Sequence, residues 1–180
     1  MDARRGNRSQ VILATKAGAK PTYPGGGFEN KEGLSLKRLR TDYIDMYYTH
    51  IDDKDVSLEE TLETLDRFVR SGKVRAIGCS NYQTPRLHEA LTASRHNTWA
   101  AYSCIQQRYT YLQPDPKADF GVQVVADDEL LDYCHNNNMT VLAYSPLLGG
   151  AYTRADQLSE NLGSSDILLT SEQIERLNRA

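Results

Sequence analysis

The chain has 180 residues, with 21 Lys and Arg against 24 Asp and Glu, so its formal net charge is −3. This balance gives no electrostatic reason to expect binding to nucleic acid or to an anionic membrane surface. No apolar run approaches the roughly 18 residues that span a bilayer, and no hydrophobic signal segment follows the basic first residues. The three cysteines are widely spaced without a C-x-x-C pair, a pattern typical of reduced thiols in a cytoplasmic protein.

Five short apolar, β-branched or aromatic runs predict β-strands at Val11–Thr15, Tyr43–Tyr48, Val74–Gly78, Ala101–Ile105 and Thr140–Ala143. Amphipathic patterns with helix-start signals lie after several of them, beginning near Ser57, Thr84, Asp127 and Thr170. Strands that alternate with helices predict βαβ units and a parallel sheet. We expect a flexible basic N-terminus over residues 1–10 and one domain over residues 11–180. Periodicity alone leaves open whether the sheet is open or closed into a barrel.

Polar side chains stand where the predicted strands end, at Lys16, His50, Ser80–Asn81, Gln106 and Tyr144. The carboxyl ends of parallel strands meet at one edge of a sheet, where reactive groups gather in α/β proteins. Four of these positions have a structural alternative: a solvated lysine, a loop histidine, the Ser80–Asn81 turn pair and a core tyrosine ring. Their corresponding positions in successive units favour a functional role. No metal-ligand spacing, G-x-G-x-x-G fingerprint or phosphate loop is present in the sequence.

Two longer segments stand out, DYIDMYYTH at 42–50 and GKVRAIGCSNY at 72–82. The first resembles the fourth-strand segment of the aldo-keto reductases, and the second is similar to that family's signature around its fifth strand. Shorter motifs follow the family's order at Ala14–Lys16, Gln106–Tyr109, Ala143–Leu147 and Asp156–Gly163. The resemblance implies an α/β fold, an incomplete (β/α)8 TIM barrel of about five parallel strands, counterparts of strands 3–7. It also implies an oxidoreductase that uses NADP(H) to reduce a small aldehyde or ketone.

The resemblance also implies roles for individual residues. Lys16 and His50 match two members of the family's catalytic tetrad. The positions that match cofactor-binding residues are Ser80, Asn81 and Gln106 for the nicotinamide carboxamide, Tyr144 for stacking on the nicotinamide, Arg154 for the 2′-phosphate, and Gln157, Glu160 and Asn161 for the adenosine end. No metal is expected.

The chain also departs from the family's pattern. The tetrad's Asp and proton-donating Tyr lie near the family's first two strands, and this chain begins at the counterpart of the third. Internal deletions are expected between Ser35 and Leu36 and between Ala151 and Asp156. Tyr48 lies two residues before His50, but we expect it one layer deeper in the barrel, away from substrate.

Three hypotheses follow from the match and the departures. The first is a truncated NADP-dependent carbonyl reductase whose activity is impaired because the catalytic Tyr and Asp are absent. The second is a catalytically inactive relative that binds nucleotide or serves as an interaction protein. The third is a shortened product that folds poorly and self-associates through two open sheet edges.

Overall fold

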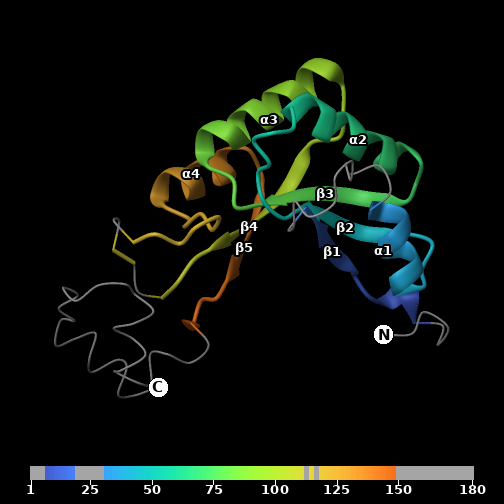
Figure 1. The fold of residues 1–180 in the computed structure, drawn as a ribbon, viewed down its shortest axis with the longest axis horizontal. Coiled ribbons are helices and arrows are strands. Elements are labelled where there is room, and N and C mark those ends of the chain that lie inside the picture. The colour runs from blue at the N-terminus through green and yellow to red at the C-terminus, as the bar shows by residue number, and fades with distance from the viewer. Residues whose placement is uncertain (1–6, 19–30, 112–113, 116–117, 149–180) are drawn as a thin grey trace.

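The computed structural model describes residues 7–18, 31–111, 114–115 and 118–148. Its centre is a parallel sheet with the strand order β1-β2-β3-β4-β5 (Figure 1). The strands are β1 (Ala14–Ala17), β2 (Ile44–Thr49), β3 (Val74–Ser80), β4 (Tyr102–Arg108) and β5 (Thr140–Tyr144). Every neighbouring pair is parallel, so the predicted incomplete barrel of five strands is confirmed.

The first strand differs from its prediction, since pairing begins at Ala14 rather than Val11. Two backbone groups just before Ala14 are hydrogen-bonded to side chains instead of to a neighbouring strand. The Arg8 guanidinium donates to the Val11 carbonyl at 3.1 Å, and the Leu13 N–H donates to Asp45 Oδ2 at 2.9 Å. The later strands extend past their predicted ends, and β4 continues through Arg108 because its polar residues keep pairing with β5.

Helices α1 (Lys31–Leu39), α2 (Leu58–Arg70), α3 (Thr84–Asn97) and α4 (Asp128–Asn136) connect the strands. The Ser57 hydroxyl accepts the Glu60 N–H at 3.1 Å, and Asp127 accepts the Leu130 N–H at 2.9 Å, as the capping signals predicted. Gly72 follows α2 with a φ of +74°, the left-handed conformation that ends a helix most readily at glycine. The helix predicted from Thr170 lies outside the described residues.

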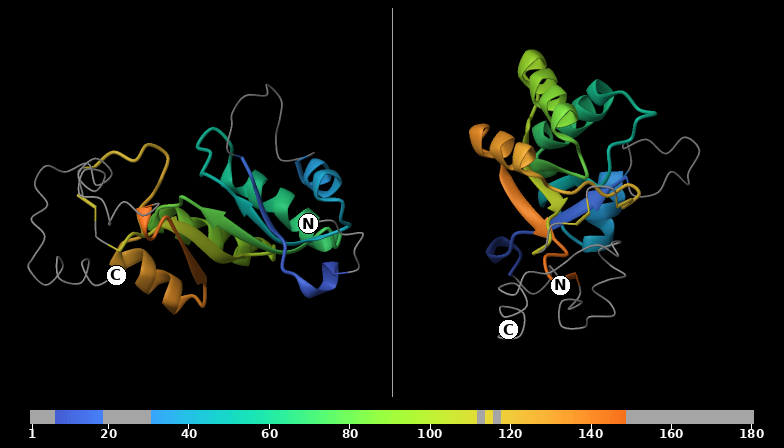
Figure 2. Two further views of the ribbon diagram at one scale, coloured as in Figure 1. Left: turned by 90° about the horizontal axis from the view of Figure 1, so that it is seen from below. Right: turned by 90° about the vertical axis from the view of Figure 1, so that its left-hand side faces the viewer.

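The hydrophobic core lies between the sheet and helices α2, α3 and α4, which cover one face of the sheet (Figures 1 and 2). Tyr47 of β2 is fully buried and meets Phe68 of α2 edge to face, with 6.2 Å between ring centroids. Among the described residues, no helix covers the opposite face of the sheet. In the described part of the chain, no helix is both long and apolar enough to cross a membrane.

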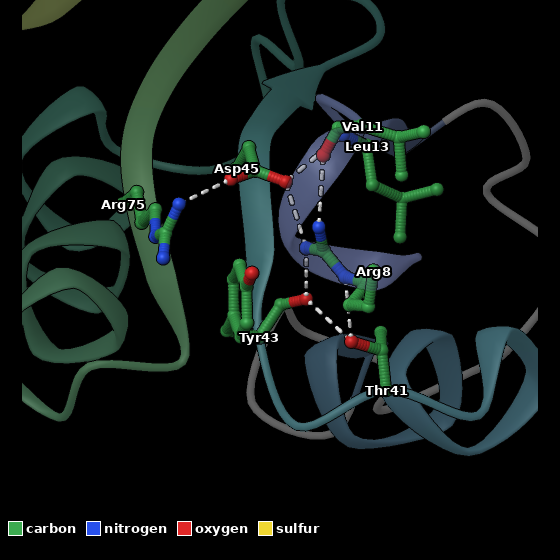
Figure 3. Close-up of polar contacts among 7 residues, drawn as sticks. All are labelled: Arg8, Val11, Leu13, Thr41, Tyr43, Asp45 and Arg75. Atoms are coloured by element: carbon green, nitrogen blue, oxygen red, sulfur yellow. Dashed lines mark hydrogen bonds and ion pairs between the residues drawn. The ribbon is translucent and has the colours of Figure 1, made fainter. Parts of the chain in front are cut away.

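A charged cluster around Asp45 links the starts of the first three strands (Figure 3). Asp45 pairs with Arg8 at 2.7 Å and with Arg75 at 2.8 Å, and both guanidinium groups lie within about 4 Å of the Tyr43 ring centroid. Burial tends to raise the pKa of Asp45, but the hydrogen bond from Leu13 and the charge of Arg8 outweigh it, so this pKa is lowered. The predicted flexible segment 1–10 overlaps this cluster at Arg8; its first six residues lie outside the described residues.

Candidate active site

The predicted strand-end residues converge on one pocket of about 340 Å3 at the carboxyl end of the sheet. Each strand contributes from its own end: β1 through Lys16, β2 through the residue that follows it, and β3, β4 and β5 through residues at or near their last positions. The lining residues are Lys16, His50, Ile51, Ser80, Asn81, Gln106, Val122, Gln123 and Tyr144. The structure therefore brings together every predicted site residue that lies in its described part.

Two basic side chains share this pocket. The His50 N–H donates to the Ala17 carbonyl at 2.8 Å, so the histidine backbone is tied to the end of β1 next to Lys16. Burial lowers the pKa of His50, and the positive charge of Lys16 lowers it further. Burial also lowers the pKa of Lys16. Among the described residues, no carboxylate pairs with the Lys16 ammonium, and none lines the pocket.

The Asn81 amide joins three other pocket residues and the backbone of Val124. Its Nδ2 donates to the His50 carbonyl at 2.9 Å and to Ser80 Oγ at 3.2 Å. Its Oδ1 accepts the Tyr144 hydroxyl at 2.8 Å and the Val124 N–H at 3.3 Å. Two donors and two acceptor positions are all that an asparagine side chain offers. Asn81 was predicted to hold the nicotinamide carboxamide, and in this arrangement its amide is fully used within the protein.

The Gln106 amide, also in the pocket, has no such partners. Gln106 is half-buried, and no hydrogen bond links its side-chain amide to another described residue. The Ser80 hydroxyl next to it donates to the Gln106 backbone carbonyl at 2.6 Å. A glutamine amide is both a donor and an acceptor, which is what a ligand carboxamide requires. With the Tyr144 ring in the same pocket, these residues fit a flat ring that carries an amide.

Tyr48 does not enter the pocket. Its side chain is 4% exposed, and its hydroxyl shares a hydrogen bond with Cys104 Sγ at 3.2 Å. Burial raises the pKa of Tyr48, and Cys104 raises it further. A buried phenol with a raised pKa is a poor group to exchange protons near neutral pH. The deeper position predicted for Tyr48 agrees with this arrangement.

Sequence reasoning missed two contributions to the site. Val122 and Gln123, from the segment before α4, line the pocket, and Gln123 accepts a hydrogen bond from Arg108 at 2.8 Å. Gln107 is fully buried and bonds to the backbone around Asn81. The alternation of β4 gave a signal for Gln107, because it places this residue on the same face as the buried Ile105.

Four predicted cofactor residues, Arg154, Gln157, Glu160 and Asn161, lie outside the described residues.

Comparison with known proteins shows the family of this chain. The model of the aldo/keto reductase family matches residues 1–180. The chain is 32% identical over 156 residues to aldo-keto reductase YhdN of Bacillus subtilis, covering 82% of this chain and 42% of that protein. It is 31% identical over 153 residues to L-glyceraldehyde 3-phosphate reductase of Escherichia coli, covering 81% of this chain and 41% of the relative. The chain thus spans less than half the length of these relatives.

Solved structures share the fold. The crystal structure of a thermostable aldo-keto reductase, Tm1743, matches with a TM-score of 0.63 and 26% identity, covering 96% of this chain and 72% of that one. A structure described as a putative 2,5-diketo-D-gluconic acid reductase B matches with a TM-score of 0.65 at 23% identity, covering 96% and 68%. From the family match over the whole chain, we conclude that this protein belongs to the aldo/keto reductase family.

Proposed function

We propose that this pocket serves hydride transfer between NADP(H) and a small aldehyde or ketone. The observation that carries the proposal is the convergence of Lys16, His50, Ser80, Gln106 and Tyr144 on one pocket. The names of relatives support the chemistry: one from Schizosaccharomyces pombe is an aldo-keto reductase named with NADP(+), and one from Bacillus subtilis is a glyoxal reductase.

In this proposal the chain's own residues bind and orient. Gln106 and Ser80 hold the nicotinamide carboxamide through amide and hydroxyl groups, and the Tyr144 ring packs against the nicotinamide. The nicotinamide itself supplies or accepts the hydride. Arg154, Gln157, Glu160 and Asn161 are proposed to hold the adenosine end.

His50 is proposed to orient the carbonyl oxygen and to stabilise the negative charge that develops there. Its lowered pKa favours the neutral imidazole, in which one ring nitrogen is a donor and the other an acceptor. Lys16 lies beside it in the pocket. A cation in this position lowers the pKa of a neighbouring proton donor, which eases proton transfer near neutral pH.

No tyrosine hydroxyl in the described pocket is free to protonate the product alkoxide. The hydroxyl of Tyr144, the tyrosine that lines the pocket, is bound to Asn81. General acid catalysis contributes roughly 10²- to 10⁴-fold to such reactions. We therefore propose that a polypeptide of these 180 residues alone binds nucleotide but turns over poorly. The second candidate, a catalytically inactive nucleotide-binding protein, is favoured by the absence of a carboxylate partner for Lys16 among the described residues.

Fluorescence titration with NADPH and NADH tests the binding step. We expect NADPH to bind more tightly, and Gln106→Ala to weaken NADPH binding about tenfold. Gln83→Ala is the matched control, because Gln83 is exposed and its side chain makes no capping bond at the start of α3. Failure of the unmodified chain to bind either nucleotide would overturn the proposal.

An NADPH absorbance assay with a reactive aromatic aldehyde tests the catalytic step, run beside size-exclusion chromatography of the same sample. We expect little turnover by the 180-residue chain. Clear turnover by a monodisperse sample that His50→Ala abolishes would contradict the proposed impairment and show that another residue supplies the proton.

A further inference from the structure

Gln107 is an amide placed in the core of the protein. Its side chain is 0% exposed and lies on β4 beside Gln106, whose side chain lines the pocket. Its Oε1 accepts the backbone N–H of Asn81 at 2.5 Å, and its Nε2 donates to the backbone carbonyl of Tyr82 at 3.0 Å. One side chain from β4 thus holds two consecutive residues that follow β3.

These two bonds fix the orientation of the Gln107 amide. The Asn81 N–H requires an acceptor and the Tyr82 carbonyl requires a donor, so exchanging the oxygen and nitrogen of Gln107 would break both bonds. A buried amide without hydrogen-bond partners destabilises a protein. The pairing therefore favours one backbone position for the segment that it holds.

The held backbone is an unusual one. Asn81 has a φ of +60°, in the left-handed region that asparagine enters more readily than most residues but still at some cost. In this conformation its side chain reaches the His50 carbonyl, Ser80 Oγ and the Tyr144 hydroxyl at 2.8–3.2 Å. Release of the Asn81 backbone would displace an amide that contacts three other pocket residues.

We infer that Gln107 is a positioning residue of the nucleotide pocket, which holds the Asn81 backbone so that the Asn81 amide aligns His50 and Ser80. The inference rests on the proposed function for its ligand, a nicotinamide nucleotide. Gln107 does not line the pocket, so its effect on binding is transmitted through Asn81. Of two adjacent glutamines on β4, Gln106 faces the ligand and Gln107 holds the residue beside it.

The test compares Gln107→Met with Gln107→Glu in the full 180-residue chain. Methionine keeps the approximate size and removes both bonds, whereas glutamate keeps an oxygen that accepts the Asn81 N–H. Ser94→Ala is the matched control: Ser94 is also 0% exposed and bonds a backbone carbonyl, that of Ala100 at 3.1 Å, but it lies on α3 and does not line the pocket. Three quantities are measured: the melting temperature, hydrogen exchange of the Asn81 backbone N–H by NMR, and NADPH affinity by fluorescence.

We expect Gln107→Met to raise the Asn81 exchange rate at least tenfold and to weaken NADPH binding about tenfold. Gln107→Glu keeps Asn81 protected, and Ser94→Ala lowers the melting temperature without changing exchange or affinity. The inference would be overturned if Gln107→Met lowered the melting temperature but left Asn81 exchange and NADPH affinity unchanged. Faster Asn81 exchange with unchanged NADPH affinity would overturn it too. If Gln107→Met does not fold, loss of Asn81 protection in Gln107→Glu overturns it.

Failure of the proposed function gives a different result. The unmodified chain would then bind no NADPH, and Asn81 exchange alone would decide the inference. Continued protection of Asn81 in Gln107→Met would show that Gln107 does not hold this segment.

Discussion

His50 and Lys16 place two ionisable bases in one pocket whose described lining has no carboxylate. Each is less easily protonated than in water, because burial disfavours the charged form of both and the charge of Lys16 also opposes a charge on His50. Lys16 has the higher ordinary pKa of the two, so it holds a proton more readily than His50 does. An oxygen that becomes negative in this pocket would favour the protonated form of both side chains.

Lys16→Met is expected to raise the pKa of His50 toward its ordinary value, because one of the two causes of the lowering is removed. Burial remains, so the pKa stays below that of an exposed histidine. Because His50 binds its proton less readily in the folded state than in the unfolded state, the free energy of unfolding falls as the pH drops below about 6.5, and this loss shrinks in the variant. NMR titration of the His50 ring measures its pKa. Lys37→Met, at an exposed position on α1, should leave the pKa of His50 unaltered. An unchanged His50 pKa in Lys16→Met would contradict the coupling.

Tyr144 has two features that affect nucleotide binding in opposite ways. Its ring offers a stacking surface, while its hydroxyl occupies Asn81 Oδ1 at 2.8 Å. If a nicotinamide carboxamide bonds to that oxygen, the Tyr144 hydroxyl must give way. Tyr144→Phe keeps the ring and frees the oxygen, so we expect NADPH to bind about two- to tenfold more tightly, the equivalent of one neutral hydrogen bond.

Fluorescence titration measures this effect, with Tyr144→Ala as the comparison. The alanine variant loses the ring as well, and we expect its affinity for NADPH to fall about tenfold or more. Weaker binding by Tyr144→Phe would contradict the exchange of partners and would indicate that the Tyr144–Asn81 bond persists when nucleotide is bound.

Among the secondary-structure elements, β2 and β3 approach each other closely where Gly78 faces Tyr48. A Cβ atom at Gly78 would lie 2.6 Å from Tyr48 Cε1 and 2.9 Å from the Cys104 carbonyl oxygen. The ring cannot turn away freely, because its hydroxyl is bonded to Cys104 Sγ. The sequence at this position is thus fixed by packing between strands rather than by backbone conformation.

Gly78→Ala is expected to lower the free energy of unfolding by roughly 1–3 kcal/mol, the usual cost of overpacking a core. Denaturant unfolding measures this loss. Tyr48→Ala removes the ring atoms that the new methyl group would meet, so the loss from Gly78→Ala should shrink in that background. Gly72→Ala is the contrasting case, since nothing lies within 4 Å of its Cβ and its φ is +74°. An equal loss with and without the Tyr48 ring would contradict the packing explanation.

The order and type of the elements were predictable from the sequence where local signals decide them. The Ser57 and Asp127 caps and the left-handed Gly72 follow from the chemistry of a few adjacent residues. The start of β1 was not predictable in this way. Arg8 and Asp45 satisfy backbone groups before Ala14, and these partners are 3 and 32 residues from the groups that they bond.

For the whole molecule, the gathering of the strand-end residues was predictable because parallel strands carry their carboxyl ends to one edge. The hydrogen-bond pattern within the pocket was not. The predicted ligand contact of Asn81 stays a prediction, and sequence reasoning did not indicate that its amide bonds to His50, Ser80, Tyr144 and Val124. Such a choice among partners depends on a left-handed φ and on side chains up to 63 residues away, which local patterns do not specify.

The sheet also has two edges that no described strand covers. In the described part of the chain, β1 pairs with β2 alone and β5 with β4 alone. Unpaired N–H and C=O groups at a sheet edge favour association with another chain. Exposed apolar side chains add to this tendency: Ile12, just before β1, is 86% exposed, and Leu142 in β5 is 38% exposed.

We therefore expect the 180-residue chain to self-associate at micromolar concentration, with a mass by light scattering above the 20.3 kDa of one chain. The double variant Ile12→Lys, Leu142→Lys places a charge at each edge, where lysine opposes strand addition, and we expect it to return the mass to that of one chain. Thr92→Lys adds a charge at an exposed position of α3 and should leave the association unchanged. A monomeric unmodified chain would contradict the expectation and would mean that other parts of the chain cover both edges. Association that persists in the edge variant but not in Thr92→Lys would place the contact on the helical face instead.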